Sequence, residues 1–383
     1  MSRRLTIGFD AKRAVLNYSG IGNYSRLALE SLRKLLPVDN TDFRLYTPKI
    51  KPNVQLQPLL DEEGINLVTP DTFKGRMLKS VWRSKWLTAQ LVRDGVGLYH
   101  GLSNELPLGI DRSGIPSIVT IHDLIFLRHP EFYHKADVGI CDRKFRYAAN
   151  VATRIIAISE RTRLDLMELY GIPSEKIDVV YQGCADIFYQ QISQEEIEAV
   201  RRQYNLPKHY IIGIGTIESR KNQMLALKAL PMLPEDVSLV LVGRHTAYTD
   251  KVIAIAREMG LESRLHIIHG AQFAHFPAMY AGAIAASYPS FYEGFGIPIL
   301  EAIAAGVPVI AATGSCLEEA GGPGAIYVDP KSVDDFAKAA NSLIESPTLR
   351  TETVEAGREY IKRFSARNFA EGLLDTYRKV AKI

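Results

Sequence analysis

The fold is decided by the stretch Ser290-Phe-Tyr-Glu-Gly-Phe-Gly-Ile-Pro-Ile-Leu-Glu-Ala-Ile-Ala-Ala-Gly-Val-Pro-Val-Ile310. An apolar run over 284–288 precedes it and predicts a buried parallel strand. Pro298 fits the first turn of a helix, because that position needs no N–H donor, and Gly306 fits the end of that helix. A second apolar run over 307–312 predicts the next buried strand. The stretch therefore predicts a strand–helix–strand unit of a parallel α/β sheet.

Two glycines and two carboxylates in this stretch indicate a binding site. Gly294 and Gly296 allow the backbone to approach a ligand, because neither residue carries a Cβ. The N-terminus of the predicted helix has unpaired N–H groups and partial positive charge, which favour an anion. Glu293 and Glu301 are expected beside that anion, where sugar hydroxyls are the natural partners of carboxylates. Taken alone, such a pair is explained more simply as a loop residue and a solvated helix face.

The complete pattern is more specific than the pair. Glu-x7-Glu within Ser-Phe-Tyr-Glu-Gly-Phe-Gly-Ile-Pro, followed by Glu-Ala-Ile-Ala-Ala-Gly-Val-Pro-Val-Ile, closely resembles the signature of retaining GT-B glycosyltransferases of family 4. Those enzymes move a sugar from a nucleotide diphosphate donor to an acceptor hydroxyl. The resemblance implies that Glu293 contacts the donor sugar and Glu301 the ribose. It also implies that backbone groups hold the sugar and phosphate at Gly294, Phe295, Gly296 and Ile297.

Length and composition set the broad class. A chain of 383 residues is too long for one typical core and predicts two domains. A net charge of +3 does not indicate a polyanionic partner, and nucleic acid is not expected. Three scattered cysteines, an odd number without metal-site spacing, indicate core residues in a reducing compartment. Without a signal peptide or an apolar run of about 20 residues, we expect a cytoplasmic protein whose membrane contact, at the inner face, is peripheral.

Strand-like runs alternate with helical stretches in both halves, which predicts two doubly wound parallel sheets. In order, the runs cover 5–10, 43–46, 65–69, 97–100, 117–122, 154–158 and 177–181, then 210–216, 238–242, 265–268, 284–288, 307–311 and 325–328. The pattern turns polar between about 183 and 195, which indicates the linker. In GT-B proteins a C-terminal helix crosses back to the first domain. The expected domains are therefore 1–188 with the helix 368–383, and 189–367.

The first strand is followed by a glycine-containing segment. A loop over 17–24 and a helix over 25–36 are expected, and a strand, loop and helix in this order form a phosphate-binding arrangement. Gly20 and Gly22 lack the third glycine of a dinucleotide fingerprint, which disfavours an NAD site. The resemblance implies that these two glycines belong to the loop facing the donor diphosphate.

A histidine follows another predicted strand. His122 and Asp123 come after the apolar run Ile118-Val-Thr-Ile121, at a strand end where ligands gather in such sheets. A single histidine at a strand end is more often structural, and Asp123 equally fits the cap of a turn. The resemblance implies that the histidine of this His-Asp dipeptide lies beside the donor sugar, near its anomeric carbon.

The second half opens with a cationic motif. Gly215-Thr-Ile-Glu-Ser-Arg-Lys-Asn222 follows the first strand of that half. Arg220 and Lys221 can offer a bidentate and a point-like cation to a diphosphate. A solvated pair is the weaker explanation, because positive charge at a helix start opposes the helix dipole. The segment also resembles the family's second diphosphate-binding motif, which adds Gly215 and Thr216 to the expected donor site.

A basic stretch, Lys74-Gly-Arg-Met-Leu-Lys-Ser-Val-Trp-Arg-Ser-Lys-Trp-Leu87, contains both tryptophans of the chain. On one continuous helix Leu78, Trp82 and Trp86 would share a face. One explanation is a helix on an anionic membrane surface, near a lipid-linked acceptor, which makes 74–93 a possible peripheral membrane contact. The other is an amphipathic helix whose tryptophan face packs on its own sheet.

The resemblance implies a GT-B fold of two Rossmann-like domains, with the donor bound mainly to the second and the acceptor to the first. The expected catalytic residues are His122, Glu293, Arg220 and Lys221, and the product keeps the anomeric configuration of the donor. No Asp-x-Asp motif occurs, so neither a metal nor a cofactor is expected, and the nucleotide sugar is a substrate. Because the segments Ser-Gly-Ile-Gly-Asn-Tyr and Ile-His-Asp-Leu resemble bacterial mannosyltransferases of surface-polysaccharide assembly, GDP-mannose is the expected donor. A sugar-nucleotide epimerase, an α-glucan synthase and a non-catalytic nucleotide-sugar-binding protein are the alternatives.

Overall fold

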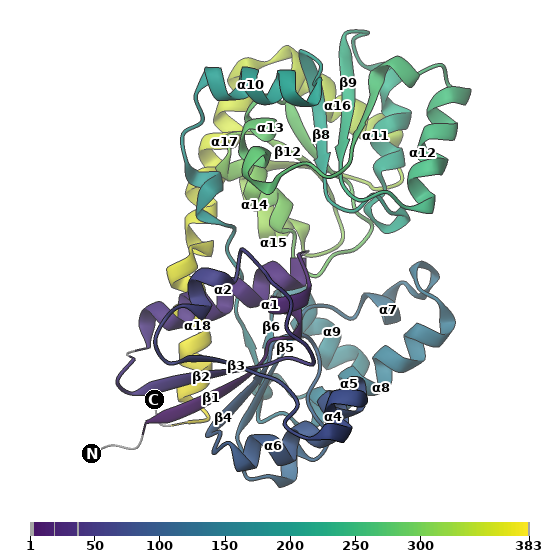
Figure 1. Cartoon of the computed structure of the whole chain (residues 1–383). Helices are drawn as coiled ribbons and strands as arrows, with labels where there is room; N and C mark the ends of the chain where they lie inside the picture. Colours follow the sequence, from purple (N-terminus) through teal and green to yellow (C-terminus); the bar gives the residue numbers. More distant parts are fainter. Residues whose placement is uncertain (1–3, 19, 37, 382–383) are drawn as a thin grey trace. The chain divides into compact units, whose positions relative to one another are not determined.

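A computed structural model describes residues 4–18, 20–36 and 38–381 (Figure 1). The chain forms two compact units, Met1–Gln182 together with Ala366–Ile383, and Gly183–Ser365. The expected boundaries, after residues 188 and 367, lie a few residues further along the chain than these. Each unit is described separately below.

The first unit contains a seven-stranded parallel sheet in the order β3-β2-β1-β4-β5-β6-β7. Its strands are β1 Leu5–Asp10, β2 Thr41–Tyr46, β3 Ile65–Val68, β4 Leu98–Gly101, β5 Ser117–Ile121, β6 Arg154–Ala157 and β7 Ile177–Val179. Every predicted strand of this half is present, and no end is displaced by more than two residues. The strand order reverses between β1 and β4, and ligands of doubly wound sheets bind at such a point.

The helices of this unit lie on both faces of the sheet. They are α1 Lys12–Leu16, α2 Gly20–Leu35, α3 Gln57–Leu60, α4 Phe73–Met77, α5 Lys79–Val81, the π-helix η1 Trp82–Trp86, α6 Leu87–Arg93, α7 Ile125–Arg128, α8 Lys135–Val151, α9 Glu160–Tyr170 and α18 Ala366–Arg378. Short 3₁₀ helices are η2 Ile110–Arg112, η3 Pro130–Phe132 and η4 Ser174–Lys176. The last two residues of the predicted terminal helix, 382 and 383, lie outside the described ranges.

The C-terminal helix α18 packs beside α2 in the first unit (Figure 1). On α18, the Tyr377 hydroxyl lies 2.6 Å from Nδ1 of His100 on β4. The other ring nitrogen, Nε2, lies 2.8 Å from the Thr120 hydroxyl, which lies 3.0 Å from the hydroxyl of Tyr24 on α2. Burial lowers the pKa of His100 to about 3, so the imidazole is neutral at pH 7. A buried chain of neutral hydrogen-bonding groups therefore connects α18, β4, β5 and α2.

The second unit contains a six-stranded parallel sheet in the order β10-β9-β8-β11-β12-β13. Its strands are β8 His209–Ile214, β9 Val237–Val242, β10 Leu265–Ile268, β11 Ala285–Tyr288, β12 Val309–Ala312 and β13 Ala325–Val328. Its helices are α10 Gln194–Tyr204, α11 Gln223–Ala229, α12 Ala247–Glu258, α13 Phe276–Ala281, α14 Ile297–Ala304, α15 Leu317–Gly321, α16 Val333–Glu345 and α17 Pro347–Ile361. The 3₁₀ helices are η5 Asp186–Tyr189, η6 Ser219–Lys221, η7 Leu230–Met232, η8 Glu262–Arg264, η9 Phe273–His275, η10 Gly322–Gly324 and η11 Lys362–Phe364. These strands agree with the predicted runs to within two residues.

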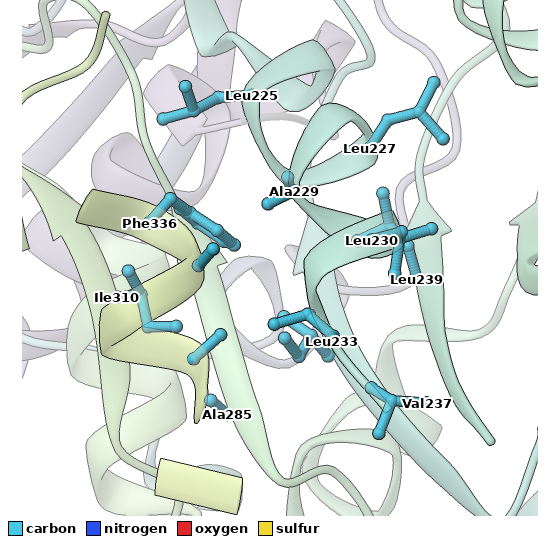
Figure 2. Packing of buried hydrophobic residues seen from close by; sticks show 14 of the residues in the cluster. Leu225, Leu227, Ala229, Leu230, Leu233, Val237, Leu239, Ala285, Ile310 and Phe336 are labelled. Atoms are coloured by element: carbon cyan, nitrogen blue, oxygen red, sulfur yellow. The ribbon is translucent and has the colours of Figure 1, made fainter. Parts of the chain in front are cut away.

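The core of the second unit lies between the sheet and its helices (Figure 2). Leu227 on α11, Leu239 on β9, Ile310 on β12 and Phe336 on α16 belong to one fully buried cluster. Strand β9 is buried along its whole length, as a central parallel strand with both faces covered should be. This packing fixes the positions at which the loops following β8 and β11 leave the sheet.

Two predicted helices differ from the structure. Helix α2 begins at Gly20, so the expected loop over 17–24 and helix start at 25 are wrong; residue 19 lies outside the described ranges. The stretch 74–87 does not form one helix, because α4 ends at Met77 and a second helical run, made of α5, η1 and α6, extends from Lys79 to Arg93. Leu78 lies between α4 and α5 and is 52% exposed, whereas Trp82 is 1% exposed, so these two side chains do not share a face. No helix in the described ranges is both long and apolar enough to span a bilayer.

Candidate active site

The structure brings three predicted residues of the second unit into one buried cluster. Lys221 ends η6, which follows β8, and Glu293 lies in the loop that follows β11. The Lys221 Nζ atom donates to Glu293 Oε1 at 2.8 Å, and Arg220 Nη1 lies 2.6 Å from Glu293 Oε2. The three side chains are only 11–15% exposed. The two cations therefore hold both oxygens of one carboxylate.

The charges of this cluster stabilise one another. Burial alone would raise the pKa of Glu293, but Lys221 and Arg220 outweigh burial and lower the pKa to about 2. Burial alone would lower the pKa of Arg220, and the carboxylates of Glu293 and Glu218 raise it instead. Glu293 is consequently a carboxylate at neutral pH, and its proton affinity is too low for a general base.

The two loops that carry the cluster are tied together by residues that the sequence did not single out. Asn222 adopts a left-handed conformation with φ 56°, and its Nδ2 donates to the carbonyls of Pro289 at 3.1 Å and Pro330 at 2.7 Å. The Ser290 hydroxyl donates to Glu293 Oε1 at 3.0 Å. Asn222 is the last residue of the cationic motif, and the preference of asparagine for turns and the left-handed conformation was the signal that the sequence offered.

A buried thiol also holds the Glu293 loop. The Sγ atom of Cys316 lies 3.0 Å from the Glu293 carbonyl and 2.9 Å from the Phe295 carbonyl, and Cys316 is fully buried. A thiol has one proton, so it donates to one of these carbonyls at a time. From the sequence, Cys316 was expected to be an ordinary core residue.

The predicted helix start at Gly296 is present. Gly296 has φ 129° and precedes α14, with Pro298 in the first turn, where its missing N–H leaves no bond unmade. An added Cβ at Gly296 would lie 3.2 Å from Leu317, in a conformation that L side chains rarely adopt. The Ile299 N–H donates to the Gly296 carbonyl at 2.9 Å, and the partial positive charge at the start of α14 favours an anion there. The backbone from Gly294 to Ile297 forms the approach to this helix.

Glu301 lies in the second turn of α14 and is buried. Burial raises its pKa to about 8, and Lys221 opposes this shift only partly. Glu301 and Glu293 therefore differ in charge at neutral pH, since Glu301 is largely protonated and Glu293 is ionised. A protonated carboxyl can donate one hydrogen bond and accept others, which suits a ribose hydroxyl.

The glycine before the cationic motif allows a close approach. Gly215 has φ 141°, and an added Cβ would lie 3.6 Å from Cε of Lys221. Its carbonyl packs against Gly243, where an added Cβ would lie 1.9 Å from the oxygen. Thr216 is half-buried, and its carbonyl accepts a hydrogen bond from Gln223 Nε2 at 3.1 Å. The Gly215 backbone therefore packs closely against the aliphatic part of the Lys221 side chain.

His122 belongs to the first unit and follows β5. Its Nε2 lies 2.9 Å from the Leu102 carbonyl, which only accepts, so Nε2 carries the proton and Nδ1 has a lone pair. Burial lowers the pKa of His122 to about 4, although the Leu102 carbonyl opposes this. The ring meets that of Tyr24 edge to face at 4.6 Å. His122 is therefore a neutral acceptor held beside the first turns of α2.

The predicted glycine loop is wrong in conformation, because Gly20 and Gly22 lie in the first turns of α2. An added Cβ at Gly22 would lie 2.1 Å from the Asn17 carbonyl, whereas nothing lies within 4 Å of one at Gly20. Arg26 Nη1 donates to the carbonyls of Ala14 at 2.9 Å and Asn17 at 2.8 Å, and this closes the turn before the helix. Position 22 therefore has no room for a side chain, whereas position 20 has space around it.

A charged cluster at the carboxyl ends of β1 and β4 was not predicted. Asp10 ends β1, and its carboxylate accepts from Arg83 Nη2 at 2.5 Å and from the Ser103 hydroxyl at 2.9 Å. Arg83 Nη1 donates to Glu105 Oε2 at 2.7 Å. Burial raises the pKa of Asp10, but Arg83 outweighs it and the pKa is lowered. The pairing of Arg83 with Asp10 could not be recognised from the sequence, because 73 residues separate them in the chain.

Over the residues that the structure describes, no group of three or more His, Cys, Asp or Glu side chains is placed to hold a metal ion. The predicted residues fall into two sets. Arg220, Lys221, Glu293 and Glu301 gather in the second unit, and His122 lies with Gly20 and Gly22 in the first.

Comparisons with known proteins show what the whole chain resembles. The chain is 28% identical over 286 residues to O-antigen chain mannosyltransferase B of Escherichia coli, covering 73% of this chain and 74% of the relative. It is 23% identical over 365 residues to O-antigen chain mannosyltransferase RfbU of Salmonella typhimurium, covering 92% and 94%. The crystal structure of Anabaena HepE in complex with UDP and glucose matches with a TM-score of 0.73 at 20% identity, covering 98% of this chain and all of that one.

Two family models match consecutive parts of the chain. Residues 26–185 match the model described as Glycosyltransferase Family 4, and residues 195–360 match Glycosyl transferases group 1. The matched parts contain strands β2 to β13 and the cluster around Glu293, whereas β1 and α18 lie outside them. The chain therefore belongs to the group 1 glycosyltransferases of family 4 and has the GT-B fold.

Proposed function

We propose that the protein transfers a mannosyl residue from GDP-mannose to a hydroxyl of a glycan or lipid-linked acceptor, with retention of the anomeric configuration, during surface-polysaccharide synthesis. The observation that carries this proposal is the buried cluster of Arg220, Lys221 and Glu293. Glu293 stands four residues before the start of α14. Similarity to two O-antigen chain mannosyltransferases supports mannose as the sugar.

The cluster has unused capacity for a nucleotide sugar. An ammonium has three N–H groups, and Lys221 donates to Glu293 and to the Tyr288 hydroxyl at 3.0 Å, which leaves one for a diphosphate oxygen. Glu293 accepts from Lys221, Ser290 and Arg220, and a carboxylate offers about four lone-pair positions. The Tyr288 hydroxyl also forms a hydrogen bond with Glu293, so a donor-sugar hydroxyl would take the place of the Tyr288 or Ser290 hydroxyl. The partial positive charge at the N-terminus of α14 also favours a diphosphate.

In the proposed reaction, the bond between the anomeric carbon and the diphosphate oxygen breaks, and the diphosphate keeps the electron pair. The acceptor oxygen forms the new bond to that carbon, and its proton passes to the departing diphosphate. Arg220 and Lys221 stabilise the charge that develops on the leaving group. Neither the nucleotide sugar nor this charge stabilisation requires a cofactor or a metal in the proposal.

Retention is assigned to attack from the face on which the diphosphate departs. A covalent intermediate would need a nucleophile on the face of the sugar opposite the diphosphate. Glu293 is a poor nucleophile, because Lys221 and Arg220 hold both of its carboxylate oxygens. Its pKa of about 2 also makes it weakly basic. We assign Glu293 to orienting the sugar, Glu301 to the ribose, and His122 to accepting a sugar hydroxyl through Nδ1.

The acceptor is assigned mainly to the first unit. The Asp10–Arg83–Glu105 cluster at the β1 and β4 ends offers carboxylate and guanidinium groups to hydroxyls. A lipid-linked acceptor places the protein at a membrane surface, and peripheral contact through 74–93, at the cytoplasmic face, is part of this proposal.

The test is a thermal-shift and calorimetry panel of GDP, UDP, ADP and their sugar conjugates, with and without EDTA, followed by transfer assays. A shift selective for GDP that EDTA does not change supports the donor assignment. Mannosyl transfer with an unchanged anomeric configuration in the product supports retention. Selectivity for UDP would overturn the donor, a new sugar nucleotide formed without acceptor would indicate an epimerase, and no binding of any nucleotide would overturn the enzyme assignment.

A further inference from the structure

A pocket of about 380 Å³ opens on the first unit beside the π-helix η1. Trp82, Trp86 and Phe73 line it together with Lys74, Lys85 and Arg93. Its size falls at the lower end of the roughly 300–1,000 Å³ of small-molecule sites. The pocket is separate from the charged clusters described above, and the proposed sugar transfer does not use it.

The π-helix determines how the pocket is built. Leu87 N–H donates to the Trp82 carbonyl, which widens this turn by one residue. Trp82 thereby points inward at 1% exposure, and its Nε1 donates to Gln90 Oε1 at 2.8 Å. Arg83 is directed to Asp10, and Lys85 stays exposed. Because the indole N–H already has a partner, the floor presents an apolar surface.

The rim is defined here as Phe73, which lines the pocket, and Met77 and Leu78, which follow Phe73 closely in the chain and are also exposed. Phe73 is 76% exposed, Met77 69% and Leu78 52%, and they lie within six residues of one another. Single exposed apolar residues are normal on a soluble protein, but a group beside an apolar pocket marks an interaction site. The pocket and its rim are therefore matched to an apolar ligand.

The surrounding charge is mainly positive, since Asp71 is the one acidic side chain among the residues that line the pocket. Lys74, Lys79 and Lys85 are exposed, and no acidic group in the described ranges forms an ion pair with any of them. Residues 71–93 contain a single acidic residue, Asp71, and Arg93 neutralises it at 2.6 Å. An apolar pocket surrounded by unpaired cations complements a ligand with an apolar chain and an anionic head.

We infer that this pocket binds one acyl chain of an anionic membrane phospholipid, with the lipid phosphate at Lys74 and Lys85, and thereby docks the protein on the bilayer. The inference deepens the proposed function, because a lipid-linked acceptor is met at the same surface. It defines a site for an individual lipid rather than a general attraction to the membrane. The π-helix η1 connects the pocket with the Asp10–Arg83–Glu105 cluster, because it carries both Trp86, which lines the pocket, and Arg83, which binds Asp10.

The tryptophans provide the assay, because the chain has only Trp82 and Trp86 and both line the pocket. Full-length protein is mixed with vesicles of phosphatidylglycerol and phosphatidylcholine whose acyl chains carry bromine, a contact quencher of tryptophan. Brominated phosphatidylcholine vesicles are the neutral comparison. We expect quenching with the anionic vesicles and weak quenching with the neutral ones.

Variants that keep both tryptophans test the site. Phe73→Ser with Met77→Ser removes the apolar rim, and Lys74→Glu with Lys85→Glu reverses the charge. Each cation near an anionic membrane strengthens binding about fivefold, so the charge reversal should weaken vesicle binding by more than tenfold. Val54→Ser and Lys251→Glu change equally exposed positions elsewhere and should leave binding unchanged. Circular dichroism verifies that each variant is folded.

Three outcomes would overturn the inference. One is wild-type quenching in both pocket variants, and another is no quenching by anionic vesicles. The third is a wild-type dimer in sedimentation velocity that Phe73→Ser with Met77→Ser converts to a monomer, which would make a second copy of the chain the occupant. None of these measurements involves nucleotide binding, so GDP calorimetry on the same proteins shows separately whether the proposed function fails.

Discussion

Replacing Lys221 with methionine tests the donor site most directly. Methionine keeps the length and apolar stem of lysine while removing the ammonium that joins Glu293 and Tyr288. The proposed hydrogen bond to the diphosphate is charge-assisted, and such bonds contribute about 1.5–3 kcal/mol. The expected dissociation constant for GDP is therefore roughly 10- to 150-fold higher than in the wild type.

The substitution also acts on the protein without ligand. Removing one partner of a buried ion pair costs about 3–5 kcal/mol when the other charge is left alone. Glu293 keeps Arg220 and Ser290, so the expected loss in free energy of unfolding is smaller, about 1–3 kcal/mol. Urea denaturation measures this loss, and calorimetry at a temperature well below the melting transition measures GDP binding.

Two further variants make the experiment decisive. Lys221→Arg keeps a cation and should recover part of the affinity, whereas Lys251→Met changes an exposed lysine on α12 and should bind GDP like the wild type. A folded Lys221→Met protein with wild-type GDP affinity would refute the assignment of Lys221 to the diphosphate.

Three other residues give distinct predictions. Glu293→Gln should impair transfer at least 100-fold, with a GDP affinity within about threefold of wild type. Because the pKa of Glu293 is lowered to about 2, the stability that this carboxylate provides is present above pH 4.5 and is lost as the pH falls towards 2. The difference in free energy of unfolding between wild type and variant, measured in urea, should therefore shrink by about 2 kcal/mol between pH 6 and pH 3. Because the pKa of Glu301 is raised to about 8, the unfolded state loses this proton at lower pH than the folded state, and the free energy of unfolding of the wild type falls as pH rises. Glu301→Gln should remove about 3 kcal/mol of that fall between pH 5 and pH 8. Parallel plots of unfolding free energy against pH for wild type and variant would contradict this. His122→Ala should lower kcat about 10- to 100-fold without changing the GDP dissociation constant, and unchanged turnover would exclude a contact with sugar.

Much of the proposed donor site was predictable, because its residues follow the ends of strands. The strands are mainly apolar runs of three to six residues, and strand ends carry ligands in doubly wound sheets. Glu293, Arg220 and Lys221 follow β11 and β8, which are neighbours in the sheet, so their loops meet. The direct pairing was not predictable, since Lys221 and Glu293 are 72 residues apart in the chain. The helix at Gly296 was recognised because glycine and proline act locally.

What the sequence by itself determined is therefore local: which runs form strands, where glycines permit a close approach, and which charged residues follow a strand. Tertiary structure alone decided the rest. Helix α2 begins at Gly20 because Gly22 packs on Asn17 and Arg26 closes the preceding turn. The break at Leu78 and the π-turn over 82–86 accompany the burial of Trp82 and the pairing of Arg83 with Asp10, which is 73 residues away in the chain. Burial and ion pairing also separate the pKa values of the two glutamates, because desolvation and Coulomb energies depend on neighbours that only the folded chain assembles.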